Sequence, residues 1–315
     1  MQQAPDSATR LTGALLALLA GLAALGSLAT NIILPAFPDI AGELGTSVKE
    51  LSATLASFFV AFAVGQLFVG PLSDRFGRQW LVVFGLVVFV AGSAICALAG
   101  SLPQLIVGRI VQALGVCATS VLSRAIARDL FEGEALARAL SLIMVAMAAA
   151  PGFSPLLGGA LNSVLGWRST FGLVALMAVL LGIRYLTSLG ETHGVDKRVP
   201  LSGSAVLKTY AELLGDRRFI APALSVSLVI GSLYMFFSLA PAILMTGFGF
   251  SPLGLSLFFA ATVFVVFGAG LLAPRLARRM GQIRAARAGI LIAGAGGVAL
   301  LVGPENTTYF CAAIT

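Results

Sequence analysis

The densest chemistry in this sequence lies in the stretch GPLSDRFGRQ, residues 70–79, which gathers Asp74, Arg75 and Arg78 beside Gly70 and Gly77. A carboxylate can accept hydrogen bonds from an arginine or a helix N-terminus, and an arginine can bridge to carbonyl or acidic groups. Glycine allows another helix to approach closely. Such contacts can form in one conformation and break in another, so we expect the cluster to bias a two-state equilibrium. The alternative is ordinary charged anchoring at a membrane edge.

A second set of polar residues lies within or beside long apolar runs. The segment LIVGRIVQALGVC carries Arg109 and Gln112, and Asn31 lies near the end of the first apolar run. If the apolar segment 104–126 crosses a membrane, Arg109 lies roughly 9 Å inside the outer end of that segment. Burying an arginine there costs free energy unless its charge is paired with another group or hydrated. We therefore expect Arg109 to face a central cavity at the depth of Asn31. Snorkelling to the outer headgroups is the alternative.

Enzymatic chemistry is not indicated. Catalysis by a nucleophile or a metal needs a base, or a cluster of ligands, near the reacting group. The sequence has one histidine, His193, and its three cysteines, at 96, 117 and 311, have no metal-ligand spacing. We therefore expect no enzyme, no metal site, no organic cofactor and no nucleotide motif.

The composition requires these residues to be positioned by membrane-spanning helices. Hydrophobic residues make up 58% and charged residues 10% of the chain, and the mean hydropathy is +1.00. About 20 apolar residues are needed to cross the hydrocarbon core. The sequence predicts an all-α integral membrane protein with nine full spans and the start of a tenth near Thr308. The nine predicted spans are 12–35, 51–72, 80–99, 104–126, 139–161, 169–189, 219–243, 253–273 and 285–303.

The distribution of positive charge predicts the orientation in the membrane. When the connections are assigned alternately to two sides, 17 of the 20 lysines and arginines fall on one side. The positive-inside rule makes that side cytoplasmic, together with the N-terminus. The net charge of +7 is therefore explained by the orientation of the protein in the membrane. Because no basic face is interleaved with aromatic residues, we expect no nucleic-acid partner.

The chain divides into two halves that resemble each other. Residues 190–217 form the longest polar segment and predict a cytoplasmic loop between an N-terminal six-helix bundle, 1–189, and an incomplete C-terminal bundle, 218–315. Part of this loop, 205–214, is plausible as an amphipathic surface helix. An offset of 204 aligns residues 47–78 with 251–282 without a gap. Six spans separate the copies, so both halves should enter the membrane in the same orientation. We expect about three further spans in a complete molecule, which would make this chain truncated at its C-terminus.

At the stretch 70–79 the sequence resembles the major facilitator superfamily pattern G-x-L-a-D-R-x-G-R-[RK] between spans two and three. Within that superfamily the chain resembles drug:proton antiporters of the bicyclomycin and chloramphenicol resistance (Bcr/CflA) type. The resemblance implies the major facilitator fold, two like-oriented six-helix bundles, and a gating role for residues Gly70, Asp74, Arg75, Gly77 and Arg78. Gln79 departs from the pattern.

Three further motifs support the resemblance. Arg109 and Gln112 match R-x-x-Q-G, with Ala113 in place of the glycine. The segment NIILPAFP resembles D-x-Y-L-P-A-x-P, but Asn31 stands where relatives have an aspartate. Proton coupling then needs Asp39, a carboxylate in the further spans expected of a complete molecule, or a carboxyl group on the substrate, and Asp39 is the candidate within this sequence. The segment APGFSPLLGG resembles an antiporter motif and predicts a kinked span packed against the other half. Its residues are Pro151, Ser154, Pro155, Gly158 and Gly159.

The resemblance implies a secondary exporter of small, fairly apolar compounds in the inner membrane, working by alternating access with proton antiport. We expect the following substrate-binding residues: Asn31, Arg109, Gln112, Met144, Met147, Tyr234 and Phe237. The expected partners are a small-molecule substrate, protons and the lipid bilayer, and we expect a monomer. The alternatives are a solute:proton importer of the same superfamily and a non-transporting membrane protein.

Overall fold

The computed structural model describes residues 12–194, 196, 198 and 202–302, and this part of the chain is helical with no β-strand. The first half contains six long helices and one short one. They are α1 (Gly13–Asn31), α2 (Phe37–Leu44), α3 (Val48–Phe76), α4 (Arg78–Ala97), α5 (Leu102–Leu130), α6 (Gly133–Leu165) and α7 (Arg168–Ser188). A short 3₁₀ turn, η1 (Leu34–Ala36), lies between α1 and α2.

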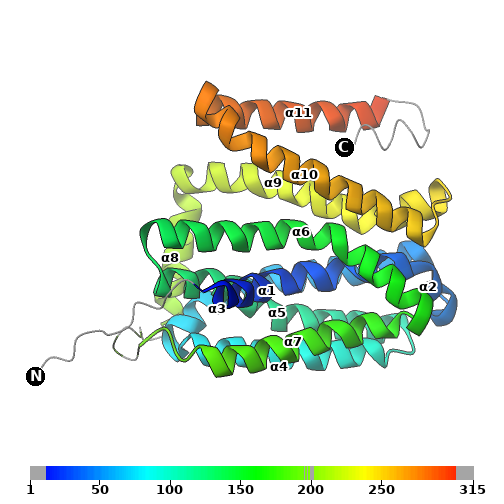
Figure 1. The fold of residues 1–315 in the computed structure, drawn as a ribbon, viewed down its shortest axis with the longest axis horizontal. Helices are drawn as coiled ribbons and strands as arrows, with labels where there is room; N and C mark the ends of the chain where they lie inside the picture. The colour runs from blue at the N-terminus through cyan, green and yellow to red at the C-terminus, as the bar shows by residue number, and fades with distance from the viewer. Residues whose placement is uncertain (1–11, 195, 197, 199–201, 303–315) are drawn as a thin grey trace, which may run out of the picture.

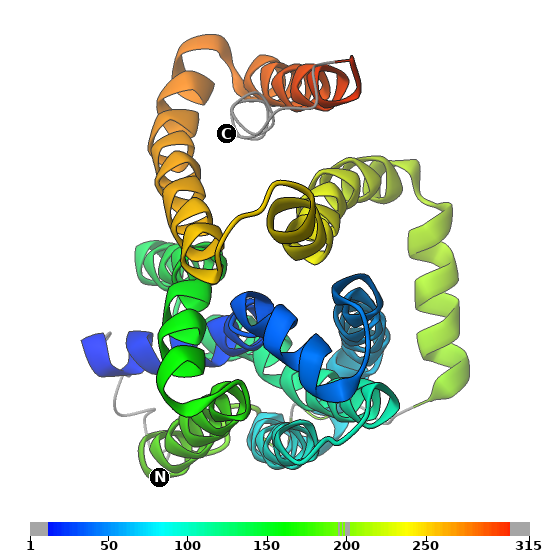
Figure 2. The same ribbon diagram turned by 90° about the vertical axis from the view of Figure 1, so that its right-hand side faces the viewer.

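The second half begins after a connecting helix, α8 (Gly203–Gly215), which matches the helix predicted in the 190–217 loop. It contains α9 (Arg217–Ala240), the π-helical turn η3 (Pro241–Gly247), α10 (Pro252–Met280) and α11 (Gln282–Val302). Figure 2 shows α8 crossing the edge of the molecule to join the first half to α9.

Each of the nine predicted spans coincides with one long helix. In the described residues, seven helical stretches are long and apolar enough to cross a membrane by length and composition, from Gly13–Leu44 to Arg217–Gly247. The exact count of nine stays a prediction, and the tenth span near Thr308 lies outside the described residues. Several helices are longer than the predicted spans. Helices α3 and α5, for example, have 29 residues each, since they continue through the charged residues at their ends.

The internal repeat predicted from the sequence is present in the fold. Helices α3 and α10 have 29 residues each and start 204 positions apart. Each is followed by one glycine with positive φ, Gly77 at 95° and Gly281 at 84°, where a side chain would be strained. Helices α4 and α11 then start 204 positions apart as well.

Local signals explain where the helices begin and bend. At the start of α3, the side chain of Ser47 accepts from the backbone of Glu50, and the Glu50 carboxylate accepts from the backbone of Ser47, which is a capping box. Prolines 35 and 38 interrupt the first span and separate α1 from α2 because proline lacks a backbone donor.

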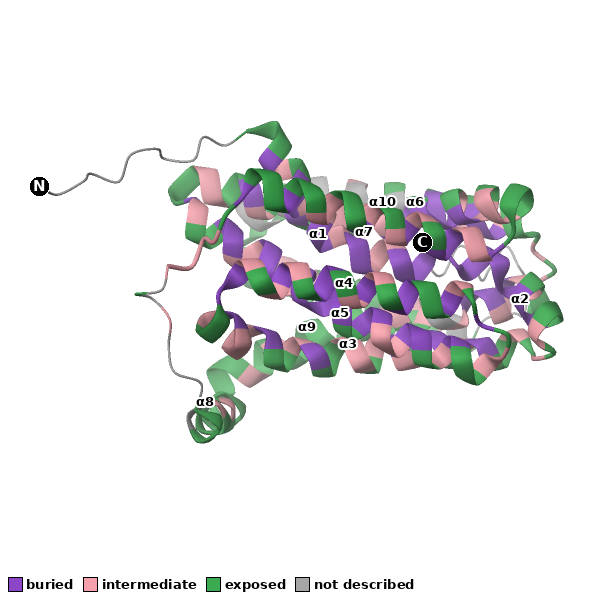
Figure 3. Cartoon of the chain, turned by 90° about the horizontal axis from the view of Figure 1, so that it is seen from below, coloured by how far each residue is buried: buried purple, intermediate pink, exposed green. Residues whose placement is uncertain are grey.

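Two packed clusters organise the structure. The larger one lies inside the first half, where α1 and α5 are the most buried helices; Figure 3 shows buried positions running along both. The second cluster combines residues of both halves, including Leu34, Phe37 and Leu55 from the first and Leu244 and Phe259 from the second.

The two ends of the molecule therefore differ. We call the end with α2, the C-terminus of α6 and the N-terminus of α10 the α2 end, and the opposite end the α8 end. The halves pack together at the α2 end, and α10 runs diagonally away from α6 toward the α8 end (Figure 1).

Candidate functional site

The predicted pair Arg109 and Gln112 forms the centre of a buried polar network. On α5 the two residues are three positions apart and share a face, and the Nη1 of Arg109 donates to Oε1 of Gln112 at 2.6 Å. The same Nη1 donates to the carbonyl oxygen of Ala29 in α1 at 3.1 Å. Gln112 in turn donates to the hydroxyl of Ser93 in α4 at 2.8 Å. The network thus joins α1, α4 and α5.

Arg109 is fully buried, with 0% of its surface exposed. Its guanidinium carbon lies 4.3 Å from the centre of the Phe58 ring in α3, which gives a cation–π contact. Its Nε and Nη2 have no hydrogen-bond partner in the described part of the chain. In this conformation the ring of Phe58 covers the guanidinium, and the role of Arg109 in a central cavity and in substrate binding stays a prediction.

Asn31 is also buried, but it does not pair with Arg109. Its Nδ2 donates to the carbonyl oxygen of Ser27 at 2.8 Å, within α1. Its Oδ1 has no partner in the described residues. Asn31 and Arg109 are thus two buried polar groups with unused hydrogen-bonding capacity among the described residues.

A small central cavity of about 60 Å³ lies where the first half meets α9. Two predicted substrate-binding residues, Met147 of α6 and Tyr234 of α9, line it. Met144 is 54% exposed on α6 and does not line it, and the side chain of Phe237 lies outside what the structure describes. The other lining residues are Ala23, Gly26, Ser27, Thr30, Phe58, Phe59, Phe62 and Ser120.

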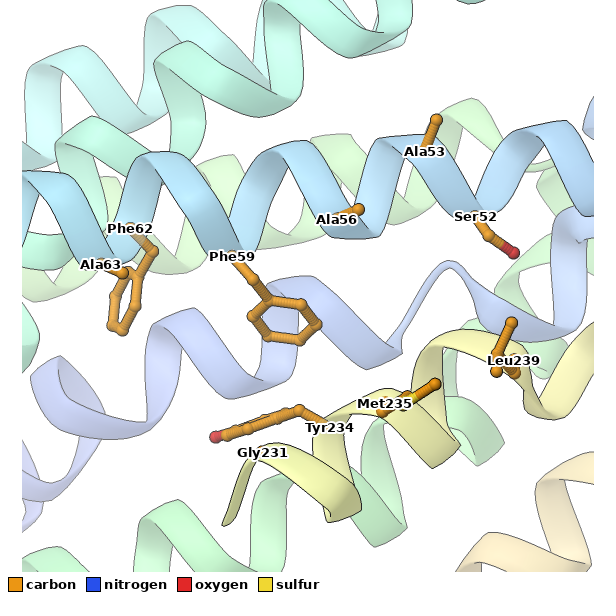
Figure 4. A pocket seen from close by; sticks show the side chains of 10 residues that line it. All are labelled: Ser52, Ala53, Ala56, Phe59, Phe62, Ala63, Gly231, Tyr234, Met235 and Leu239. Atoms are coloured by element: carbon orange, nitrogen blue, oxygen red, sulfur yellow. The ribbon is translucent and has the colours of Figure 1, made fainter. Parts of the chain in front are cut away.

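A larger groove of about 650 Å³ lies between α3 and α9. Its walls are alanine, phenylalanine, methionine and leucine side chains, with Ser52 and the hydroxyl of Tyr234 as the polar groups. Figure 4 shows Phe59 of α3 and Tyr234 of α9 facing each other across it. Their ring centres are 4.8 Å apart, and both residues also line the central cavity. Phe62 also lines both spaces, so these three aromatic residues lie between the groove and the cavity.

The charged stretch 70–79 lies at the α8 end, and Arg78 is its organising residue. Arg78 starts α4 and is 8% exposed. Its Nη1 is 2.7 Å from the carboxylate of Asp74, and its Nε is 3.2 Å from the carboxylate of Asp129 at the end of α5. It also donates to the Ser73 hydroxyl. Arg75 is exposed, and its guanidinium contacts the ring of Phe76.

A residue of the interdomain segment completes this cluster. The carboxylate of Glu191 accepts from the backbone N–H groups of Arg78, at 2.8 Å, and Gln79, at 3.3 Å. It therefore caps the N-terminus of α4, where negative charge is stabilised. Gly77 has a positive φ of 95°, which requires glycine, and a Cβ there would also lie 2.1 Å from Oε2 of Glu191. The contacts of Arg78 and Glu191 thus join α3, α4, α5 and the segment after α7, and gating by Gly70, Asp74 and their neighbours stays a prediction.

The antiporter-like segment of α6 packs against the other half, as predicted. The carbonyl oxygen of Pro155 accepts from the hydroxyl of Ser256 in α10 at 3.1 Å. A Cβ at Gly159 would lie 3.2 Å from that hydroxyl oxygen, and one at Gly158 would lie 1.8 Å from the carbonyl oxygen of Ile32. Pro151 lies inside α6, and the buried hydroxyl of Ser154 has no partner in the described residues. A role of this segment in antiport stays a prediction.

Asp39 lies on α2, beyond the end of α1, and is exposed. Its carboxylate accepts from the amide of Asn162 at the C-terminal end of α6. Nearby, Glu43 of α2 binds Arg168 and the indole N–H of Trp167. Asp39 is therefore near the contact between α2 and α6, and proton coupling through it stays a prediction.

Some residues of these sites were not predicted from the sequence. Ser93, Asp129 and Glu191 bind predicted residues from positions 19, 51 and 113 residues away in the chain, and no local pattern indicates such pairs. The small residues Ala23, Gly26, Ser27 and Thr30 could have been noticed, since they recur at helical spacing on one face of α1.

Comparison with known proteins agrees with this architecture. A family profile described as Major Facilitator Superfamily matches residues 19–315. The uncharacterized MFS-type transporter YdgK of Bacillus subtilis is 36% identical over 248 residues, which cover 78% of this chain and 62% of that protein. A chloramphenicol resistance protein of Pseudomonas aeruginosa is 32% identical over 274 residues, covering 86% of this chain and 64% of that protein. The chain thus spans less than two thirds of the length of either relative.

Other relatives are named bicyclomycin resistance protein homolog and multidrug resistance protein D. Among solved structures, a bacterial homolog of the human lysosomal transporter Spinster, in an inward-facing and unoccupied conformation, matches with a TM-score of 0.71 and 20% identity. The match covers 97% of this chain and 73% of that one. At this identity the likeness concerns the fold.

Proposed function

Because the chain belongs to the major facilitator superfamily, we propose that it works as a secondary exporter of small, fairly apolar compounds, by alternating access coupled to proton entry. The relatives named for chloramphenicol, bicyclomycin and multidrug resistance support export. In this proposal the protein spans the inner membrane, with the N-terminus and the α8 end in the cytoplasm, as the positive charges there indicate.

The observation that carries the proposal is the central cavity between the two halves. Tyr234 comes from the second half, and the other lining residues come from α1, α3, α5 and α6 of the first. A compound in this cavity would contact both halves, so a tilt of one half against the other could expose it to either side. In this conformation the mixed hydrophobic cluster closes the α2 end.

The side chains around the cavity suit apolar cargo. Phenylalanine, tyrosine and methionine offer adaptable apolar contacts, while Ser27, Thr30 and Ser120 offer hydroxyl groups. Met147 and Tyr234 line the cavity, and we propose that they contact the compound directly.

Drug accumulation in efflux-deficient bacterial cells tests the proposal. Cells that express the protein should accumulate less of at least one compound in a broad apolar panel, and a protonophore should abolish the difference. Tyr234→Ala and Met147→Ala should reduce export, whereas Leu142→Ala should not, because Leu142 is exposed on α6 and does not line the cavity. Unchanged accumulation across the panel would count against export, and export that survives the protonophore would count against proton coupling.

A further inference from the structure

The buried charge of Arg109 has no acidic partner among the described residues. Arginine keeps its positive charge in proteins, and an unpaired buried charge is strongly destabilising. The contacts of Arg109 are a carbonyl oxygen, an amide oxygen and the face of Phe58. By contrast, the nearly buried Arg78 has two carboxylates, from Asp74 and Asp129.

The unused part of the guanidinium has a defined shape. Nη1 makes both of the hydrogen bonds of Arg109, while Nε and Nη2 make none in the described part of the chain. Nε and Nη2 share one edge of the planar group, and their parallel N–H bonds match the two oxygens of a carboxylate or sulfonate. The hydrogen bonds to Ala29 and Gln112 hold the side chain so that this edge has no partner among the described residues.

The protein supplies no negative charge next to this edge from α1. The polar side chains beside Ala29 on that helix are Thr30 and Asn31, which are neutral, and the buried Oδ1 of Asn31 is itself without a partner in the described residues. Among the described residues, the charge of Arg109 is therefore stabilised only by dipoles and by an aromatic ring.

The cavity lies directly beside this group. Phe58, whose ring covers the guanidinium, is also a lining residue of the central cavity, and so is Thr30, which follows Ala29 in the chain. One aromatic ring thus separates the charge from the cavity. A ligand that displaced this ring would come within reach of the guanidinium of Arg109.

We propose that the compound carried by this protein is an organic anion, with an apolar body in the cavity and one carboxylate or sulfonate bound to Nε and Nη2 of Arg109. This inference rests on the proposed function and specifies its substrate class. The ring of Phe58 moves aside on binding, and the cavity, at about 60 Å³, widens to hold the apolar body. The negative charge of the ligand then replaces the weaker cation–π contact.

Binding of a matched pair of compounds to the detergent-purified protein tests this inference. We choose 1-naphthoate and 1-naphthamide, which have nearly the same shape and differ in charge. Titration calorimetry should show that the protein binds naphthoate about ten- to hundredfold more tightly. Arg109→Gln should abolish that preference. Arg109→Lys should retain part of it, because lysine keeps the positive charge but lacks the two parallel N–H groups of Nε and Nη2.

Two further variants separate this role from a merely structural one. Asn31→Asp adds a negative charge on α1, two residues from Ala29, whose carbonyl oxygen accepts from Arg109, and should weaken naphthoate binding at least about tenfold with little change for naphthamide. Arg168→Gln is the matched control, because Arg168 already has Glu43 as its counterion, and it should leave the preference intact. Each variant is checked for a single symmetric peak in size-exclusion chromatography.

Equal affinities for the two compounds, no measurable binding of naphthoate, or a preference that persists in folded Arg109→Gln would each overturn the inference. Such results would leave the exporter proposal standing, since that proposal is judged by drug accumulation in cells. Conversely, loss of export across the panel with an intact naphthoate preference would overturn only the exporter proposal.

Discussion

Two arginines of the first half illustrate how differently the same side chain can be used. Arg78 lies at the α8 end and binds Asp74, Asp129 and Ser73. Arg109 is fully buried inside the first half and binds neutral groups. The charge of Arg78 is satisfied within the protein, and we expect it to hold structure together. The charge of Arg109 has no acidic partner among the described residues, and we expect it to bind ligand.

Arg78→Ala should destabilise the protein, because it leaves two carboxylates facing each other without a cation. The side chain of Asp74 is 49% exposed, so solvent screens part of this repulsion and we expect a loss of about 1–3 kcal/mol. In the detergent-purified protein this should lower the melting temperature by about 2–10 °C.

Arg75→Ala is the matched control for that change. Arg75 belongs to the same motif, but it is exposed and contacts the ring of Phe76. The melting temperature of the Arg75→Ala protein should therefore stay within about 2 °C of that of the unmodified protein. Adding Asp129→Asn to Arg78→Ala should recover part of the loss. Equal shifts in melting temperature for Arg78→Ala and Arg75→Ala would show that the ion pairs of Arg78 do not stabilise the protein.

The residue types of the candidate site could be predicted from the sequence, but their partners could not. Arg109 and Gln112 stand out because a polar pair is conspicuous in an apolar run, and the structure brings them together. Asn31 was expected to share the cavity with Arg109, yet its amide turns back to Ser27 on its own helix. Helical spacing fixes which residues share a face. It does not fix which face meets which neighbour.

At the scale of helices, the close packing of α4 against α5 depends on glycines. Gly85 and Gly92 on α4 and Gly108 and Gly115 on α5 are each seven residues apart, and thus repeat along one face. A Cβ at Gly115 would lie 2.3 Å from the backbone nitrogen of Phe89. Backbone atoms cannot move aside as a flexible side chain can, so these positions require glycine.

Gly115→Val should therefore separate α4 from α5 and disturb the Arg109 network, which includes Ser93 of α4. We expect a loss of folded protein, seen as a much smaller monodisperse peak in size-exclusion chromatography. Gly172→Val in α7 is the control, because a side chain there would meet nothing within 4 Å. If both variants gave the same yield as the original protein, the glycine seam would not be what holds these helices together.

The contact between Glu191 and α4 connects the interdomain segment to the first half. Because Glu191 caps α4 and also lies 3.6 Å from Arg198, it holds the start of that segment against the bundle. Glu191→Gln removes the negative charge from the helix N-terminus and should weaken this attachment by about 1 kcal/mol.

Limited trypsin digestion measures the attachment. Cleavage after Arg198 should become about fivefold faster in Glu191→Gln, since the segment opens more often. Glu212→Gln is the control, because Glu212 pairs with Lys208 on the exposed surface of α8. An unchanged cleavage rate in Glu191→Gln would indicate that the cap does not restrain the segment.

At the scale of the whole molecule, the sequence predicted the architecture better than the site. The long apolar runs specify the helices, and the offset of 204 specifies that α10 repeats α3, which the equal lengths and the glycines at 77 and 281 confirm. The contact of α6 with α10 was expected from the prolines and glycines of α6. Which end of the molecule is closed could not be predicted, because it depends on how the two halves tilt.

Alternating access predicts that the α2 end must open during each cycle, and a disulfide across that end tests this directly. Gly159 of α6 and Ser256 of α10 are suited to it, since a Cβ at position 159 would lie 3.2 Å from the Ser256 hydroxyl oxygen, so that the two side chains would be in direct contact. In a background where Cys96, Cys117 and Cys311 are alanine, Gly159→Cys with Ser256→Cys should cross-link under mild oxidant.

The cross-link joins one helix of each half at the closed end, so it should abolish export, and a reductant should restore it. The single variants should export normally under the same oxidant, and Gly172→Cys with Ser256→Cys should not cross-link, because position 172 lies on the exposed face of α7. The decisive result is the activity of fully cross-linked protein. If it still exported, the halves would not need to separate at the α2 end, and the compound would have to leave by a path that does not pass between α6 and α10.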